Sequence, residues 1–453
     1  MMAVVHRFTG ARLPRWALPA DWPLQGTEPV LADLMVEGGL IASVTPQPSA
    51  TGLGAAVLAD LAARTAASFA AGMSSPQASA GAAVVHLDGA PVLPGLVEAH
   101  AHLDKAFTLH RMGPVQPGLL GAIAAMHKDR AHWTAPDVRE RASQALGWAF
   151  EAGVVHLRTH VDWWEPAAVP IAWGVMNELA LEWADRLVLE RVSLMPLTLF
   201  AQREAAHSLA SQVARSGQGA RLGGFVHTSN WDAQALAHLL ESAEAFGLDV
   251  DLHVDEELNA AAQGLATTAR LMRDIGFSGR VVCSHACALA AQPEAQALST
   301  LDAVAGVAIT LVALPITNLL LQDATTGRTP RQRGLTLVKE ARSRGIPVLI
   351  GSDNVQDPFC AVGSFDPIEA FSAGVLAGQL DQPFDIGSES LCRADWLTRG
   401  PPAPPLQAGS PADWTVFGQA SVQGFPSRTQ PRTVVRNGRL LADASRHVSL
   451  ATP

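Results

Sequence analysis

Apolar runs and helical stretches alternate along the middle of the chain, between about residue 92 and residue 354. The runs are rich in β-branched residues, and most are followed by amphipathic or Ala-rich stretches such as 233–246. Strands that alternate with helices indicate βαβ units and a parallel sheet. Eight units over about 260 residues predict a (β/α)8 barrel of the TIM type. The eight runs are 92–102, 153–162, 187–198, 223–229, 249–256, 280–287, 306–315 and 347–354.

A doubly wound open sheet is the alternative for such an alternation, and it usually carries a Gly-rich phosphate loop after a strand. The nearest match, Gly52-Leu53-Gly54, lacks the third glycine and the strand before it. The barrel is therefore the better prediction.

The two ends of the chain have a different pattern. Residues 30–47 alternate apolar and polar positions around a Gly-Gly pair, which predicts short strands joined by a turn. Residues 413–417 and 433–439 also read as strands, and the second contains an Asn-Gly turn. The proline-rich stretch 401–405 is typical of a linker. We expect the strands of both ends to pair into one small β domain.

These patterns set the expected domain boundaries. Residues 1–91 and 401–453 would form the two parts of the small β domain, and residues 92–400 would form the barrel. Within the first part, residues 48–82 are rich in Ala, Gly and Ser and predict a loose helix or a surface insertion without an assigned function.

Composition narrows the class of protein. Of 453 residues, 48% are hydrophobic and 16% are charged, which suits a large buried core. The net charge is −10 and no basic stripe occurs, so we expect no nucleic-acid partner. No signal peptide and no apolar run of about 20 residues is found, which predicts a cytoplasmic protein without a membrane partner. The four cysteines are too sparse for a disulfide framework, and the sequence leaves a homo-oligomer open.

Candidate chemistry begins at the end of the first run, where His100 and His102 flank Ala101. Residues i and i+2 of a strand share a face, so one metal ion can bind both imidazoles. Functional groups of a barrel lie at the carboxyl ends of its strands, where this pair falls. Two histidines at this spacing also occur by chance, so the motif alone is weak.

Three further residues end apolar runs and strengthen the metal hypothesis. His253 ends the fifth run, His285 the sixth and Asp353 the eighth. A buried carboxylate needs a metal or hydrogen bonds to compensate it. Neutral imidazoles with one carboxylate suit Zn²⁺ or Fe²⁺ rather than Mg²⁺ or Ca²⁺. With an open position for water, such a site makes hydroxide near neutral pH.

Glu256 lies three residues after His253, where its carboxyl can reach over a metal site and carry a proton to a leaving group. The alternative is a solvated loop glutamate, which is how we interpret its neighbour Glu257.

Taken together, these motifs resemble the cytosine deaminase branch of the metal-dependent amidohydrolase superfamily. The resemblance spans most of the barrel. It rests on His100-Ala101-His102-Leu103-Asp104, Arg158-Thr159-His160-Val161-Asp162, His253-Val254-Asp255-Glu256, Ser284-His285, the run from Arg333 to Glu340, and the run from Gly351 to Pro358. The runs ending at Lys105 and at Asn354 are also similar to the N-isopropylammelide amidohydrolases.

The resemblance implies one divalent ion held by His100, His102, His253 and Asp353. It further implies that Glu256 shuttles protons, that His285 orients or stabilises the metal-bound hydroxide and that Asp353 takes the proton of the water. Water would attack an amidine carbon of a small heterocycle, a tetrahedral intermediate would form and ammonia would leave.

Three positions depart from the cytosine enzymes of this family and define candidate substrate contacts. Pro196 is followed by Leu197, where those enzymes carry a glutamine that binds the pyrimidine. Asn354 stands where they have a second aspartate, and an amide cannot accept protons as a carboxylate does. Phe359 stands where they have a tryptophan. These departures disfavour cytosine itself.

Other residues keep two interpretations. Trp163 and Trp164 follow the second run and are expected either to form a pocket wall for a flat ring or to pack under a loop. Lys105 is expected at the pocket mouth or on the surface, and His160 behind the ligands or in a structural role.

The sequence thus predicts a hydrolytic deaminase of a cytosine-like pyrimidine or a triazine. The alternative is an amidohydrolase that cleaves another C–N bond, such as an N-alkyl amine or a cyclic amide. A non-enzymatic scaffold is disfavoured, because every expected metal ligand is present.

Overall fold

The computed structural model describes residues 5–47 and 83–441, so the predicted insertion at 48–82 lies outside the described residues. The chain divides into two compact units. The larger contains Val97–Asp381 and Arg393–Pro402, and the smaller contains Met1–Leu96, Gln382–Cys392 and Ala403–Pro453. The segment Gln382–Cys392 therefore belongs to the smaller unit, although the sequence had placed it with the barrel.

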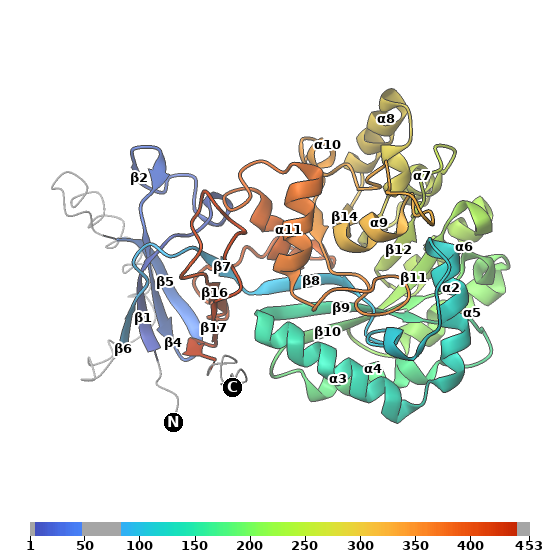
Figure 1. The fold of residues 1–453 in the computed structure, drawn as a ribbon, viewed down its shortest axis with the longest axis horizontal. Helices are drawn as coiled ribbons and strands as arrows, with labels where there is room; N and C mark the ends of the chain where they lie inside the picture. The colour runs from blue at the N-terminus through green and yellow to red at the C-terminus, as the bar shows by residue number, and fades with distance from the viewer. Residues whose placement is uncertain (1–4, 48–82, 442–453) are drawn as a thin grey trace. The chain divides into compact units, whose positions relative to one another are not determined.

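The larger unit is the expected (β/α)8 barrel. Its eight strands form one sheet in chain order, and the last strand returns to the first through a parallel bridge between Ala101 and Asp353. Figure 1 shows these strands inside a ring of helices. The strands are β8 Leu96–Ala101, β9 Val154–Asp162, β10 Val188–Leu194, β11 Ala220–Val226, β12 Val250–Val254, β13 Val281–His285, β14 Ile309–Ala313 and β15 Val348–Ile350.

Helices join successive strands and cover the outside of the barrel (Figure 1). They are α2 Leu119–Asp129, α3 Ala135–Ala152, α4 Ile171–Glu182, α5 Arg203–Ala214, α6 Ala233–Ala245, α7 Gly264–Ile275, α8 Glu294–Ala305, α9 Pro315–Leu321, α10 Val338–Arg342 and α11 Pro367–Gly378. Short 3-10 turns supplement them, at Arg15–Ala17, Leu109–Arg111, Arg130–His132, Leu197–Phe200, Thr228–Asn230, Cys287–Ala290, Gly387–Leu391 and Ala394–Trp396.

Local sequence signals account for several helix ends. The Asp232 carboxylate accepts a hydrogen bond from the backbone N–H of Gln234 at 2.9 Å and so caps the start of α6. Thr134 does the same for α3, which ends at Gly153 in the left-handed region, with φ of 104°. Capping groups and a glycine after the last turn satisfy backbone groups that the helix itself leaves unpaired.

The smaller unit contains the expected chain-end strands. One sheet has the order β5-β4-β1-β6 and a second has the order β18-β17-β16-β7, which joins a strand before the barrel to strands near the C-terminus. Trp414 packs edge-on against Phe8 at 4.8 Å within their shared core. The strands are β1 Val5–Ala11, β2 Leu24–Gln25, β3 Glu28–Pro29, β4 Ala32–Glu37, β5 Leu40–Pro46, β6 Ala83–His86, β7 Val92–Pro94, β16 Trp414–Val416, β17 Thr433–Arg436 and β18 Arg439–Leu440.

Both predicted turns join antiparallel strands. Gly38 and Gly39 connect β4 to β5 with φ of 59° and 84°, and Asn437 and Gly438 connect β17 to β18 with φ of 47° and 71°. Positive φ at both central residues suits the right-handed twist of a hairpin, which explains the Gly-Gly and Asn-Gly pairs.

Candidate functional site

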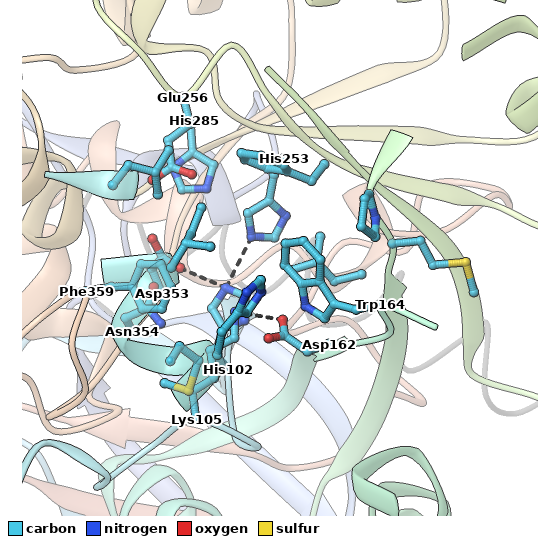
Figure 2. Close-up of a pocket in the computed structure, with 18 residues that line it drawn as sticks. His102, Lys105, Asp162, Trp164, His253, Glu256, His285, Asp353, Asn354 and Phe359 are labelled. Carbon is cyan, nitrogen blue, oxygen red and sulfur yellow. Dashed lines mark hydrogen bonds and ion pairs between the residues drawn. The ribbon is translucent and has the colours of Figure 1, made fainter. Parts of the chain in front are cut away.

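Four of the sequence-predicted residues meet at the carboxyl ends of the barrel strands. His100 lies in β8 and His102 directly follows it, His253 lies in β12, and Asp353 follows β15. All four side chains are buried, and one donor atom from each lies within 4.8 Å of the others. Figure 2 shows three of them, His102, His253 and Asp353, converging on one side of a pocket.

The donor atoms are close together. Nε2 of His253 lies 3.1 Å from Nε2 of His100 and 3.2 Å from Nε2 of His102. Oδ1 of Asp353 lies 3.1 Å from Nε2 of His102 and 3.5 Å from Nε2 of His100. Donors bound to one ion at about 2.0–2.1 Å lie about 3 Å from one another, so these distances fit a single divalent metal.

Burial keeps the imidazoles of His102 and His253 neutral, which leaves their lone pairs able to bind a metal. It lowers the pKa of His102 to about 3, and it holds the pKa of His253 well below the ordinary value. Burial acts to raise the pKa of Asp353, but the imidazoles of His100 and His102 hold that pKa well below its usual range. The set thus offers three imidazole nitrogens and one carboxylate.

Unsatisfied polar atoms support the same interpretation. Nδ1 of His100 lies 2.8 Å from the Ser284 hydroxyl, an arrangement that fixes the ring and turns Nε2 toward the cluster. Both oxygens of Asp353 are buried without a hydrogen-bond partner among the residues described. A buried carboxylate without partners is costly, and a bound cation removes that cost.

Loss of one donor should release the metal. We expect the purified protein to hold about one divalent ion per chain, and His100→Ala to lose most of it, because three donors remain and a cavity replaces the ring. Elemental analysis measures the content. His132→Ala, at an imidazole that is 72% exposed, is the control and should keep its metal. Full occupancy in His100→Ala would show that the ligand set is wrong.

Glu256 and His285 lie together beside the four donors. Glu256 Oε1 is 3.5 Å from His285 Nδ1, which lies 3.0 Å from the amide oxygen of Asn318. Burial, and then the Asp353 carboxylate, raise the pKa of Glu256 well above its ordinary value. Burial lowers the pKa of His285 to about 4. A proton-carrying carboxyl and a neutral imidazole therefore border the cluster (Figure 2).

Glu257 differs from the solvated residue that the sequence suggested. Its carboxylate accepts hydrogen bonds from the backbone N–H of Thr228 at 2.7 Å and from the Thr228 hydroxyl at 2.5 Å. It therefore holds the loop after β11, and it does not line the pocket.

The pocket combines the cluster with flat and apolar walls. Asn354 and Phe359 line it, as the sequence suggested for substrate contacts. Its lining comprises His102, Lys105, Leu119, Ile123, Met126, His127, Asp162, Trp164, Leu194, Met195, Pro196, Phe225, His253, Glu256, His285, Asp353, Asn354 and Phe359.

The expected contacts at Trp163 and Leu197 are not found in this lining. Trp163 is fully buried and packs on Trp173 at 5.5 Å, while the next residue, Trp164, forms the wall. Leu197 begins a 3-10 turn that carries its side chain into the core, with none of its surface exposed. The wall from α2, with Leu119 and Met126, was not predicted from the sequence.

His160 lies behind the cluster, where its ring stacks on His100 at 3.8 Å between centroids. With His100 and Asp251 it forms a second group whose donor atoms approach one another. Since His100 already belongs to the first group, we infer that His160 packs against the His100 imidazole and holds it in position.

Within the part of the chain that the structure describes, no helix is both long and apolar enough to cross a membrane.

Known proteins share this architecture. A sequence profile of the amidohydrolase family matches residues 205–380. A pterin deaminase from Rhizobium rhizogenes is 37% identical over 354 residues, which cover 77% of this chain and 80% of that protein.

Two solved structures have the same fold over nearly their whole length. The 5-methylcytosine deaminase from Klebsiella pneumoniae, liganded with 5-fluorocytosine, gives a TM-score of 0.72 at 21% identity, covering 96% of this chain and 97% of that one. The N-isopropylammelide isopropylaminohydrolase from Burkholderia multivorans gives a TM-score of 0.66 at 21% identity, with the same coverage of 96% and 97%. This chain belongs to the amidohydrolase family, in its deaminase branch, and is a hydrolase that acts on carbon–nitrogen bonds.

Proposed function

We propose that the protein is a hydrolytic deaminase of an amino-substituted fused heterocycle of the pterin kind. The observation that carries this proposal is the buried Glu256 carboxyl, which lines the same pocket as His102, His253 and Asp353. The sequence similarity to a pterin deaminase supports the choice of ring.

The metal is the first component of the proposed chemistry. His100, His102, His253 and Asp353 would hold one Zn²⁺ or Fe²⁺, because both ions accept nitrogen donors with a carboxylate. When bound, such an ion supplies a Lewis acid that makes water a nucleophile near neutral pH.

Proton transfer is the task of this chain's own carboxyl groups. Hydrolysis converts the ring N=C–NH₂ unit into HN–C=O. Water supplies the oxygen, one proton that leaves with ammonia and one proton that ends on the ring nitrogen. Ammonia is a poor leaving group until its nitrogen is protonated. In our proposal Glu256 takes a proton from the attacking water and delivers it to that nitrogen, while Asp353 accepts the second proton, which ends on the ring nitrogen beside the new C=O bond. His285, with its ring fixed by Asn318, faces the developing oxyanion.

Ring binding uses the flat and apolar walls. Trp164 and Phe359 offer aromatic faces, and Met126 of α2 adds an adaptable apolar surface. After β10 the pocket presents Leu194, Met195 and Pro196, none of which offers an amide to the polar edge of a pyrimidine. These walls favour a fused ring over a single pyrimidine ring.

Steady-state kinetics with ammonia detection tests the proposal on metal-replete enzyme. We expect pterin to release ammonia with a kcat/KM in the ordinary range of enzymes, about 10⁴–10⁸ M⁻¹s⁻¹. Cytosine should stay below about 10⁵ M⁻¹s⁻¹, since the site lacks a hydrogen-bonding partner for it. Efficient turnover of cytosine would refute this specificity. Release of an alkylamine from an N-alkylated triazine, without ammonia from any ring, would replace the deaminase by the amine-releasing alternative.

A further inference from the structure

A buried ion pair lies in the pocket wall beside the metal cluster. Nζ of Lys105 is 2.9 Å from Oδ1 of Asp162, and the two side chains are only 6% and 2% exposed. Lys105 follows β8 and Asp162 ends β9, so both stand at the functional end of the barrel. Both line the pocket, and Figure 2 shows them next to His102.

The surrounding groups keep both partners charged. Burial acts to lower the pKa of Lys105, but the carboxylates of Asp162, Asp104 and Asp357 together outweigh it and the pKa is raised. Burial acts to raise the pKa of Asp162, but the Lys105 ammonium holds that pKa below its usual range. The backbone N–H of Asp162 donates to Asp104 Oδ2 at 2.9 Å, which holds the backbone of Asp162 beside Asp104.

Fold stability does not account for this pair. A buried ion pair contributes little net stability, because removing two charges from water offsets their attraction. An ammonium has three N–H donors. This ammonium forms its ion pair with Asp162 and lies 5.0 Å from the ring centroid of Phe359, and the Asp104 and Asp357 carboxylates act on it electrostatically. In the described chain, Oδ1 of Asp162 is partnered by this ammonium, and a carboxylate has further acceptor positions. The pair is thus left with hydrogen-bonding capacity on the pocket side.

We propose that Lys105 and Asp162 bind the lactam edge of the substrate, the ring C=O and the neighbouring ring N–H, next to the carbon that water attacks. This inference rests on the proposed function and names the part of the ring that the site recognises. A lactam presents one acceptor beside one donor. The ammonium can donate to its oxygen and the carboxylate can accept from its N–H, which is a complementary arrangement.

Such a subsite distinguishes rings that have the lactam from rings that lack it. Pterin carries an oxo group next to a ring N–H, whereas 2-aminopteridine carries the same amino group without the oxo group. When 2-aminopteridine binds, the buried charged groups have no oxo group to pair with, and a site with unpaired buried charges discriminates strongly against such an analogue. We expect the wild-type kcat/KM for 2-aminopteridine to be at least about 10²-fold lower than for pterin.

The decisive variant is Lys105→Met, which keeps the apolar stem and removes the ammonium. We expect the kcat/KM for pterin to fall about 10²-fold or more, while 2-aminopteridine changes far less, so that the ratio between the two collapses. Because Asp162 is then left unpaired, Lys105→Met/Asp162→Asn is measured alongside as the electrically neutral pair, and it should show the same collapse. Lys128→Met, at an exposed lysine outside the pocket lining, is the matched control and should keep the wild-type ratio.

Equilibrium binding of 4-oxopteridine separates this inference from the proposed function, since that ring has the lactam but no amino group to lose. Wild-type protein should bind it more tightly than Lys105→Met does, by about 10²-fold. Equal losses on pterin and 2-aminopteridine, or unchanged binding of 4-oxopteridine, would overturn the subsite. Absence of ammonia from pterin in the wild type would refute the proposed function, and the binding measurement would still decide the subsite.

Discussion

Glu256→Gln is expected to keep its metal and to lose roughly 10²–10⁴-fold in kcat, the usual size of a general acid–base contribution. Glutamine keeps the shape of the side chain and cannot carry a proton. Glu256 is 4% exposed and lies 3.5 Å from His285, so bulk water cannot easily replace it as the proton carrier. The measurements are kcat on the substrate that releases ammonia and metal content by elemental analysis.

The matched control is the next residue along the chain. Glu257 holds the Thr228 loop and does not line the pocket, so Glu257→Gln should keep kcat within a few-fold of wild type. Near-normal turnover in Glu256→Gln would refute the proton shuttle. It would favour an enzyme that releases a more basic alkylamine, which can take its proton from solvent.

Arg158→Met is expected to have the largest effect on stability, about 3–5 kcal/mol in the free energy of unfolding. The guanidinium is completely buried and donates to Asp251 at 2.7 Å and to Glu190 at 2.6 and 2.8 Å. It also donates to the carbonyl of Leu397 at 2.8 Å. Removing it leaves the buried Asp251 carboxylate without its arginine, while Glu190 keeps Arg221 at 2.6 Å. An uncompensated buried charge costs far more than the ion pair contributed.

Urea denaturation followed by circular dichroism measures this loss. Arg139→Met is the control, because that arginine forms its ion pairs with Glu178 and Glu182 on the exposed faces of α3 and α4. Exposed pairs contribute little, so its midpoint should stay near that of the wild type. A wild-type midpoint in Arg158→Met would mean that Glu190 and Asp251 become protonated or reach water.

The barrel and the positions of the metal donors could be predicted because both follow from short-range patterns. His100 and His102 share a strand face, and His253 and Asp353 each follow an apolar run. The carboxyl ends of all barrel strands meet on one side, so placing a residue at such an end already places it at the site. The predicted fold class and the family are confirmed by the structure and the comparisons.

The substrate contacts needed information that the sequence pattern does not hold. Which of Trp163 and Trp164 faces the pocket depends on where β9 ends, since one residue of shift reverses the side-chain direction. Leu197 turns inward because β10 stops at Leu194 and a 3-10 turn follows. The partner of Lys105 lies on another strand, a pairing that spacing along the chain does not reveal.

The barrel closes at a seam, where its first strand β8 meets the residues that follow its last strand β15. The first and last strands meet where the backbone N–H of Asp353 donates to the carbonyl of His100 at 2.8 Å, and Glu98 accepts from the N–H of Ser352 at 2.9 Å. A methyl group on Gly351 would meet Glu98 at 2.8 Å, so the two edges are in close contact.

His100 and Asp353 are therefore both neighbours across this seam and expected ligands of one ion. Ligation of both would link two positions that are far apart in the chain and would stabilise the closed barrel, because the unfolded chain does not hold these donors together. The ion would thus stabilise the contact between the first and last strands as well as take part in catalysis. An enzyme without the ion would lose its activity, and its barrel would unfold less cooperatively.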